Sequence, residues 1–259
     1  MESIDRKRVW TLILSILVAA SVTFLLLSFF SAPSTVAIGP AQAGEVRCLD
    51  FENYNTLEKL TDCICDYMPH RYSVDNRHGF ITPTLTEMTQ WRQVVAQMME
   101  GECDAINLSG YDWGNDFTVT TFTDTQNSSP YCVFMETTYN TYPCGARVTH
   151  GWGTFIVNPY PCRELSIQIA HPIHDLDTAT QGIGVFKGTD SRSFLMAGTH
   201  RHANFICSAC QPPPECQPGE VVTQPEEFLE ADVAHNVENL FQPTVEKLLV
   251  QPGINPSVV

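Results

Sequence analysis

Basic residues are scarce in this chain. Of its 259 residues, 14 are Lys or Arg and 29 are Asp or Glu, which gives a formal net charge of −15 at pH 7. A protein that binds nucleic acid needs a basic face to contact the phosphates, and this composition argues against one. We therefore expect no nucleic acid partner, and the acidic balance mainly indicates a well-hydrated surface.

Several motifs of common site classes are also missing. The chain has no G-x-S-x-G segment, which disfavours a serine hydrolase of that type, and no Gly-rich loop that follows a strand in the phosphate-binding form. Cys207-x-x-Cys210, with Cys216 nearby, has no second C-x-x-C pair at the spacing of a zinc knot. Cys210 leads into prolines rather than a helix, which disfavours a redox site.

One long apolar run is present, at residues 9–32, directly after three basic residues. Such a run directs the following chain across the membrane, and it is long enough to span as a helix of about 20 residues. Residues 41–43 match the A-x-A cleavage pattern, so residues 1–44 are predicted to be a signal peptide or a signal anchor with a linker. In either case the protein is extracytoplasmic, secreted or anchored, with membrane contact only through residues 9–32 if uncleaved.

The chain contains ten cysteines, and all of them follow the apolar run: Cys48, Cys63, Cys65, Cys103, Cys132, Cys144, Cys162, Cys207, Cys210 and Cys216. An even number of cysteines in an exported chain predicts disulfide bonds, although the pairing cannot be deduced from spacing. Residues 45–82 are predicted to be a Cys-containing extension made of short polar pieces. Residues 83–259 are predicted to be an α/β hydrolase-like domain.

The periodicity of this domain alternates between helices and strands. A helix is predicted to start after Thr84, which can form a capping box with Glu87, and to end at Gly101 with a buried Met and Trp face. Strands are predicted at residues 116–122, 131–137, 153–157, 165–170 and 193–197, and helices at residues 178–187 and 225–249. The sequence therefore predicts an α/β fold with a mostly parallel or mixed sheet, flanked by helices, plus a disulfide-rich N-terminal extension.

The last predicted helix carries His235 and has a kink at Pro243. The residues from Asn255 to Val259 resemble the beginning of a further core strand. We therefore expect the natural domain to continue beyond the end of this chain.

Most of the candidate site residues follow two strands that a single helix connects. His171, His174, Asp175 and Asp177 come after the strand at 165–170, and His200, Arg201 and His202 come after the strand at 193–197. A β–α–β unit makes the two strands parallel, so both sets of side chains are expected at the same sheet edge. Open α/β sheets place their sites beyond the carboxyl ends of strands.

These residue types suit a catalytic zinc site. Zinc needs about three protein ligands from His and Asp or Glu, with one position open to water, and the bound water then ionises near neutral pH. His171, His174, Asp175 and Asp177 offer donors within one turn, while His200, His202 and His235 could add ligands from elsewhere. Arg201 has the two-pronged geometry that binds a carboxylate.

Residues 150–259 resemble the zinc-dependent hydrolases of the N-formylglutamate amidohydrolase and poly-γ-glutamate hydrolase type, which have a zinc carboxypeptidase-like fold. The resemblance lies in three features in this order: a strand followed by His-Pro, a loop and an Asp; a strand followed by Gly-Thr-His-Arg; and a helix that carries a histidine. It implies His171 as the first zinc ligand, an acidic residue shortly after it as the second, and Arg201 as the group that binds a substrate carboxylate. Asp175 is the preferred second ligand, ahead of His174 and Asp177.

The same resemblance places His235 near the helical histidine of the family. A further family histidine ends the next strand, which in this chain is cut off at Val259, so that ligand is expected to lie outside the sequence.

Two functional hypotheses follow. In the first, the protein is an exported zinc hydrolase that cleaves an amide bond near a carboxylate, in a peptide-like, γ-glutamyl or small carboxylate-bearing substrate. His171, Asp175 and His235 would bind Zn²⁺, Asp177 would be the base and Arg201 would orient the substrate, with His174, His200 and His202 as lower-ranked ligands. In the second, the protein is a non-catalytic, disulfide-stabilised extracytoplasmic binding module whose histidines only pack and form hydrogen bonds.

Overall fold

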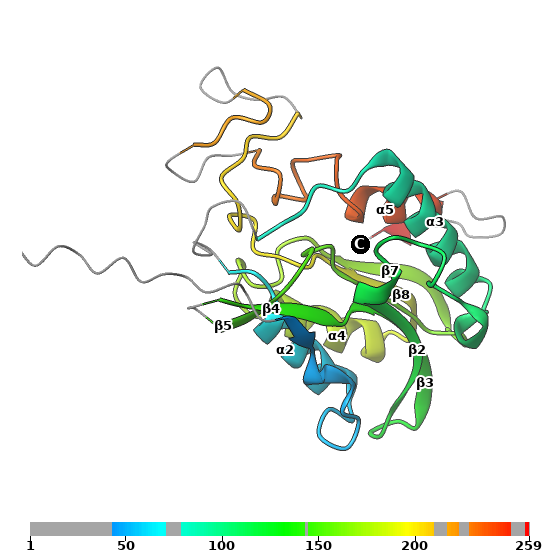
Figure 1. Ribbon diagram of the computed structural model, residues 1–259. Helices are drawn as coiled ribbons and strands as arrows, with labels where there is room; N and C mark the ends of the chain where they lie inside the picture. The colour runs from blue at the N-terminus through cyan, green and yellow to red at the C-terminus, as the bar shows by residue number, and fades with distance from the viewer. Residues whose placement is uncertain are drawn as a thin grey trace, which may run out of the picture. The chain divides into compact units, whose positions relative to one another are not determined.

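The computed structural model describes residues 43–70, 79–142, 145–209, 217–222, 228–249 and 257–258. These residues belong to one compact unit (Figure 1). Among them, no helix is long and apolar enough to cross a membrane. The predicted signal or anchor segment at residues 9–32 lies outside the described residues, so its role stays a prediction.

The centre of the fold is a mixed six-stranded sheet with the order β2-β3-β6-β8-β7-β9. Its strands are β2 (Phe117–Asp124), β3 (Ser129–Glu136), β6 (Thr154–Val157), β7 (Arg163–Ile169), β8 (Ser191–Met196) and β9 (Ser257–Val258). Neighbours from β2 to β8 are antiparallel, whereas β7 is parallel to both β8 and β9. The predicted α/β class with a mixed sheet is therefore confirmed.

Helices cover both faces of this sheet, which gives three layers (Figure 1). The helices α3 (Leu85–Met99) and α5 (Phe241–Leu249) lie on one face, and α2 (Leu57–Tyr67) and α4 (Thr178–Gly188) lie on the other. Successive side chains of a strand point to opposite faces of the sheet, so the same strands contribute to the hydrophobic cores on both faces. In β6, for example, Phe155 faces α3 while Ile156 packs in the cluster of α2 and α4.

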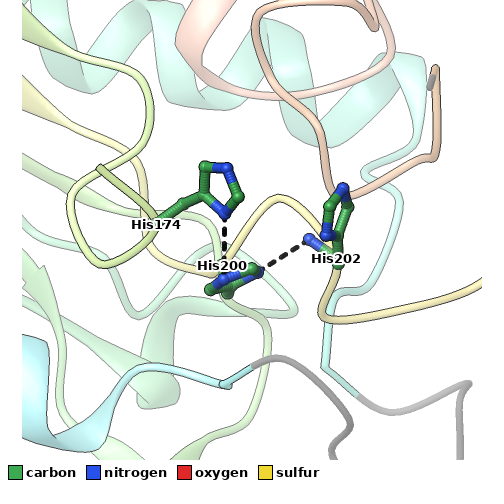
Figure 2. A group of neighbouring side chains, drawn as sticks. All are labelled: His174, His200 and His202. Atoms are coloured by element: carbon green, nitrogen blue, oxygen red, sulfur yellow. Dashed lines mark hydrogen bonds between the residues drawn. The ribbon is translucent and has the colours of Figure 1, made fainter. Parts of the chain in front are cut away.

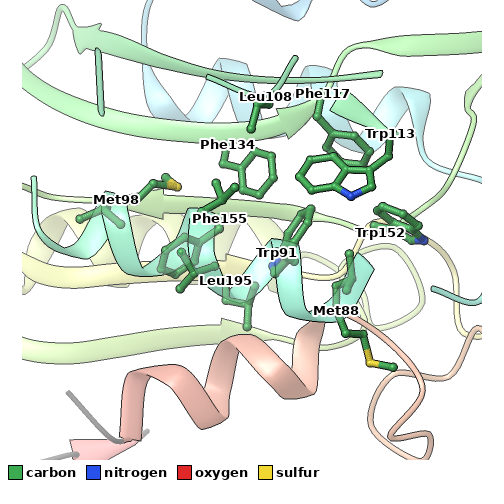
Figure 3. Close-up of a cluster of buried hydrophobic side chains, with 14 of the residues drawn as sticks. Met88, Trp91, Met98, Leu108, Trp113, Phe117, Phe134, Trp152, Phe155 and Leu195 are labelled. Carbon is green, nitrogen blue, oxygen red and sulfur yellow. The ribbon is translucent and has the colours of Figure 1, made fainter. Parts of the chain in front are cut away.

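The helix α3 matches its prediction. Thr84 and Glu87 form the capping box, and the Met and Trp face is buried as expected. At its centre Trp91 packs among Trp113, Phe134 and other aromatic rings (Figure 3), and its indole N–H donates a 2.9 Å hydrogen bond to the hydroxyl of Thr244 in α5. This face is structural core and not a ligand site.

The region of the predicted polar extension contains the helix α2, which the sequence analysis missed. Thr56 caps it, and Leu57, Leu60 and Ile64 are buried on one face. Their spacing of three and four residues is the signal that could have revealed this helix. The smaller elements are the three-stranded sheet of β1 (Ala43–Glu45), β4 (Thr138–Tyr142) and β5 (Gly145–Val148), and the 3-10 turns η1 (Arg47–Leu49), η2 (Cys103–Ala105) and η3 (Gly114–Asp116).

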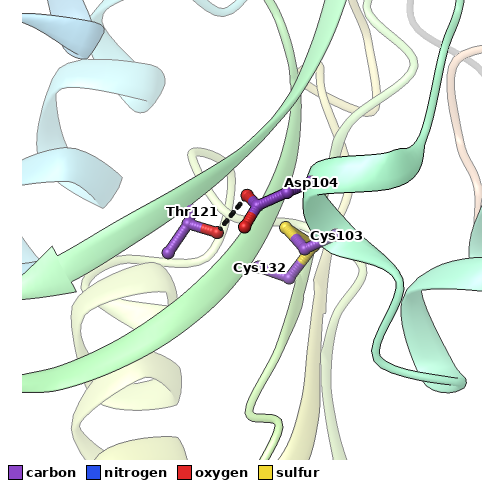
Figure 4. The surroundings of a disulfide bond; sticks show 4 residues. All are labelled: Cys103, Asp104, Thr121 and Cys132. Atoms are coloured by element: carbon purple, nitrogen blue, oxygen red, sulfur yellow. Dashed lines mark hydrogen bonds between the residues drawn. A yellow bond between two sulfur atoms is a disulfide. The ribbon is translucent and has the colours of Figure 1, made fainter.

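Disulfide bonds are present, but not every cysteine is in one. Cys48 pairs with Cys63, and Cys103 pairs with Cys132 beside a 2.7 Å hydrogen bond from Thr121 to Asp104 (Figure 4). Cys207 is also disulfide-bonded. The remaining described cysteines, Cys65 and Cys162, are free thiols. Burial and the neighbouring acidic groups Asp62 and Asp66 raise the pKa of Cys65 to about 12, so it remains protonated and unreactive.

The prediction of one long helix over residues 225–249 is wrong. In the described part of that range, residues 228–240 form consecutive turns and only α5 is helical. Asn236 explains part of this difference, because its side chain accepts the N–H of Glu238 and donates to the carbonyl of Glu230, contacts that compete with helical hydrogen bonds. Pro243 was predicted to kink this helix, but it lies in the first turn of α5. Backbone N–H groups of a first turn have no partner within the helix, so the missing N–H of proline causes no kink there.

Candidate functional site

The two parallel strands end side by side and place both histidine-containing turns at one sheet edge. Ile169 at the end of β7 pairs with Met196 at the end of β8. The residues 171–177 form the connection to α4, and residues 198–202 follow β8. The expected convergence of these two segments is therefore observed, because strand direction alone brings them together.

Short polar contacts hold each turn in place. In the first, the hydroxyl of Thr178 donates to the carbonyl of Asp175 at 2.9 Å, and Asp177 adopts a left-handed backbone (φ 61°) at the start of α4. In the second, the N–H of His200 donates to the carbonyl of Pro69 at 2.9 Å, and the hydroxyl of Thr199 donates to the carbonyl of Gly79 at 2.9 Å. The second turn is thus fixed against the segments that border residues 71–78.

His174, His200 and His202 form a group that could hold a metal ion (Figure 2). Each residue presents one ring nitrogen, and these atoms all lie within 4.8 Å of one another. Nδ1 of His174 and Nε2 of His200 share a 3.2 Å hydrogen bond, and Nδ1 of His200 accepts the backbone N–H of His202 at 3.0 Å. His200 is buried, whereas the other two are half-buried, so solvent can reach the group.

Next to this group, the buried carboxylate of Asp232 binds three side chains of the site. Its Oδ1 accepts a 3.0 Å hydrogen bond from Nε2 of His171, and its Oδ2 accepts one of 3.0 Å from Nδ1 of His235. Nη2 of Arg201 forms an ion pair of 2.5 Å with the same Oδ2. We call these four residues the Asp232 network.

Asp232 is an anion at any ordinary pH. Burial raises the pKa of its carboxyl, but the hydrogen bonds from His171 and His235 and the positive charge of Arg201 outweigh this effect and hold the pKa at about 2. The interior beside the histidine group therefore contains a negative charge, and this charge neutralises that of Arg201.

Two of the zinc ligands expected from the sequence, His171 and His235, belong to this network, and with Asp175 they do not form a compact group of three. Nδ1 of His171 lies 3.4 Å from Oδ2 of Asp175, which is compatible with a shared ion. His235 contacts the far oxygen of Asp232, so the carboxylate stands between His171 and His235. Among the described residues, His174, His200 and His202 are the one group of three such side chains whose possible ligand atoms all lie within 4.8 Å of one another.

The two expected catalytic side chains differ in their surroundings. Arg201 is mostly buried, with 18% of its side chain exposed, and its Nη2 is bound to Asp232. Asp177 is exposed, and its carboxylate forms no hydrogen bond or ion pair with the part of the chain that the structure describes. Asp175 lies closer to the histidines, with 3.4 Å to His171 and 4.0 Å to Nε2 of His174.

The sequence analysis missed Asp232. The sequence signal for it was the spacing Asp232-x-x-His235. Because this stretch was predicted to be helical, nothing indicated that the Asp232 carboxylate points back to the sheet edge. In the structure, this segment is attached to the second turn, because the N–H of Ala231 donates to Oδ1 of Asn204 and the Asn204 amide donates to Glu230.

Comparisons with family models, with curated proteins and with solved structures find no match for this chain. The resemblance to zinc-dependent hydrolases therefore stays a prediction from the sequence motifs.

Proposed function

We propose that this protein is an exported zinc-dependent hydrolase whose metal centre is formed by His174, His200 and His202. The single observation that carries the proposal is the convergence of three imidazole nitrogens within 4.8 Å at the carboxyl ends of two parallel strands. This is where open α/β sheets place their sites.

The donor set fits zinc. Three neutral imidazoles with a position left for water are a known catalytic arrangement for this ion. Nδ1 of His174 and Nε2 of His200 are separated by 3.2 Å, and the three ring nitrogens all lie within 4.8 Å of one another, so the three side chains would hold one ion between them. Zinc at such a site supplies an ionised water near neutral pH and polarises a carbonyl oxygen.

The neighbouring side chains have distinct roles in this proposal. Asp175 is exposed and lies 4.0 Å from Nε2 of His174, which suits a base that removes a proton from water or passes it to the leaving group better than the isolated Asp177 does. Arg201 keeps further N–H donors beyond the one on Asp232 and would orient a substrate carboxylate through them. The substrate is thus an amide near a carboxylate, of the peptide-like or γ-glutamyl type.

Export is part of the proposal. It is supported by the basic residues and apolar run near the N-terminus and by the disulfides Cys48–Cys63 and Cys103–Cys132, since such bonds persist in oxidising compartments.

Elemental analysis of the full chain, purified without a His tag, tests the metal centre. We expect close to one zinc per chain in the parent and a large loss in His174→Ala and His202→Ala, while His235→Ala keeps its zinc. If His171→Ala and His235→Ala lose the metal and His202→Ala does not, the ligands are those suggested by the sequence motifs. A folded parent without metal would instead favour the non-catalytic, disulfide-stabilised binding module.

A further inference from the structure

The side chain of Asp232, which lies outside both turns of the proposed metal centre, contacts a residue in each of them. It reaches the first turn through His171, which is three residues before His174, and the second turn through Arg201, which lies between His200 and His202 in the sequence. Its own segment is packed in the interior, with Leu229 and Ala231 buried. A segment outside the sheet thus adds a contact to each of the two turns, beyond the pairing of β7 with β8.

The charge of Asp232 matters as much as its position. An ion held by three neutral imidazoles keeps its full charge of +2, and the guanidinium of Arg201 sits in the same turn as two of the ligands. Like charges repel, and they do so more strongly where water is partly excluded. The 2.5 Å ion pair with Asp232 cancels the charge of Arg201 and leaves the surroundings of the three histidines favourable for a cation.

The contact with His171 has a second consequence. Because Nε2 of His171 donates its hydrogen bond to the Asp232 carboxylate, Nδ1 of His171 is the nitrogen that faces Asp175, at 3.4 Å. A carboxylate that accepts from a histidine in this way fixes the orientation of the ring and its tautomer, and here it holds His171 in the same turn as the proposed ligand His174.

We propose that Asp232 is the positioning residue of this metal centre and that it sets the metal affinity by holding Arg201 and His171 in place and by compensating the charge of Arg201. The inference rests on the proposed function, because it assumes that the three histidines bind zinc. It assigns a role to a residue that is neither a ligand nor a group that touches substrate.

The test uses the full chain and the variant Asp232→Asn, which keeps the shape of the side chain and removes its charge. Zinc affinity is measured by titration against a competing chelator. Loss of a direct outer partner of a metal ligand typically weakens binding about 10–100-fold. Asp232 contacts neighbours of the ligands rather than the ligands themselves, so we expect a loss of about 10-fold, at the lower end of this range. Hydrogen exchange of the metal-free proteins is measured in parallel, with faster exchange expected for residues 171–177 and 199–203 in the variant.

Asp124→Asn is the matched control. Asp124 is equally buried and is paired with Lys187, in the last turn of α4, at the opposite end of the helix from the histidines. This variant loses stability through the same kind of change, and we expect its zinc affinity and its exchange at the two turns to equal those of the parent. A purely structural effect of Asp232 would make the two variants alike.

The outcomes separate the two proposals. Zinc binding by the parent with equal affinity in a folded Asp232→Asn variant overturns the positioning role and leaves the metal centre intact. Equal losses of affinity in both aspartate variants also overturn it, since general destabilisation then explains the effect. No zinc binding by the parent overturns the proposed function itself, and the role of Asp232 with it.

Discussion

Asp124 and Asp232 are both completely buried, and each has a basic side chain within hydrogen-bonding distance. The oxygens of Asp124 accept the backbone N–H groups of Leu57 and Gln126 at 3.0 and 2.8 Å, and Lys187 adds an ion pair of 2.7 Å. The oxygens of Asp232 are bound by side chains, namely those of His171, His235 and Arg201.

The difference between their partners indicates different roles. Asp124 binds backbone N–H groups, which are present at these positions whatever the side chains are. It therefore joins the start of α2 to the end of β2, and through Lys187 also to α4. The partners of Asp232 are titratable or cationic side chains: His171 and Arg201 lie in the two turns that carry the histidines, and His235 lies in the same segment as Asp232. A buried carboxylate bound to side chains of these turns suits the positioning role proposed above, whereas one bound to backbone N–H groups stabilises the architecture.

The largest effect on stability is expected at Asp124. Asp124→Ala removes an ion-pair partner of the mostly buried Lys187, which keeps only Glu58 at 2.8 Å as an acidic partner. Removing one partner of a buried ion pair costs about 3 kcal/mol. We expect a decrease of this size in the free energy of unfolding by urea, without loss of bound zinc; loss of the metal would erase the distinction between the two aspartates.

A smaller effect, dependent on pH, is expected at Asp232. Burial raises its pKa, but the bonds from His171 and His235 and the charge of Arg201 lower it from 3.8 to about 2. Because folding depresses this pKa, the stabilisation is present above about pH 4 and is lost as the pH falls toward 2, and it amounts to about 2 kcal/mol.

Urea denaturation of metal-free parent and Asp232→Asn checks this value. The variant should be less stable by about 2 kcal/mol at neutral pH, and the gap should narrow steadily below pH 4. A gap that is constant from neutral to acid pH would mean that the charge of Asp232 does not contribute.

The smallest effect is expected for Glu58→Gln. Glu58 is the second acidic partner of Lys187, but 31% of its side chain is exposed, so water screens the pair. Exposed ion pairs contribute at most about 1 kcal/mol, and we expect a change below this limit in urea denaturation. A decrease in the free energy of unfolding as large as that of Asp124→Ala would show that the charge of Lys187, rather than Asp124, controls the stability of these ion pairs.

The predictions from sequence succeeded where the controlling interactions are local or follow from strand direction. The Thr84–Glu87 capping box and the buried face of α3 were confirmed, as was the meeting of the 171–177 and 198–202 turns. The analysis failed at α2, whose apolar spacing was overlooked between polar and cysteine residues, and at residues 228–240, where side-chain amides replace helical hydrogen bonds.

The sequence by itself determined the α/β class and the sheet edge at which the histidines gather, because periodicity and chain direction are properties of short segments. Which histidines come within 4.8 Å of one another, and that Asp232 binds Arg201 and His171, was decided only by the tertiary structure. The reason is physical: a buried carboxylate is stable only where donors from distant segments converge on it, and that convergence depends on the packing of the whole domain.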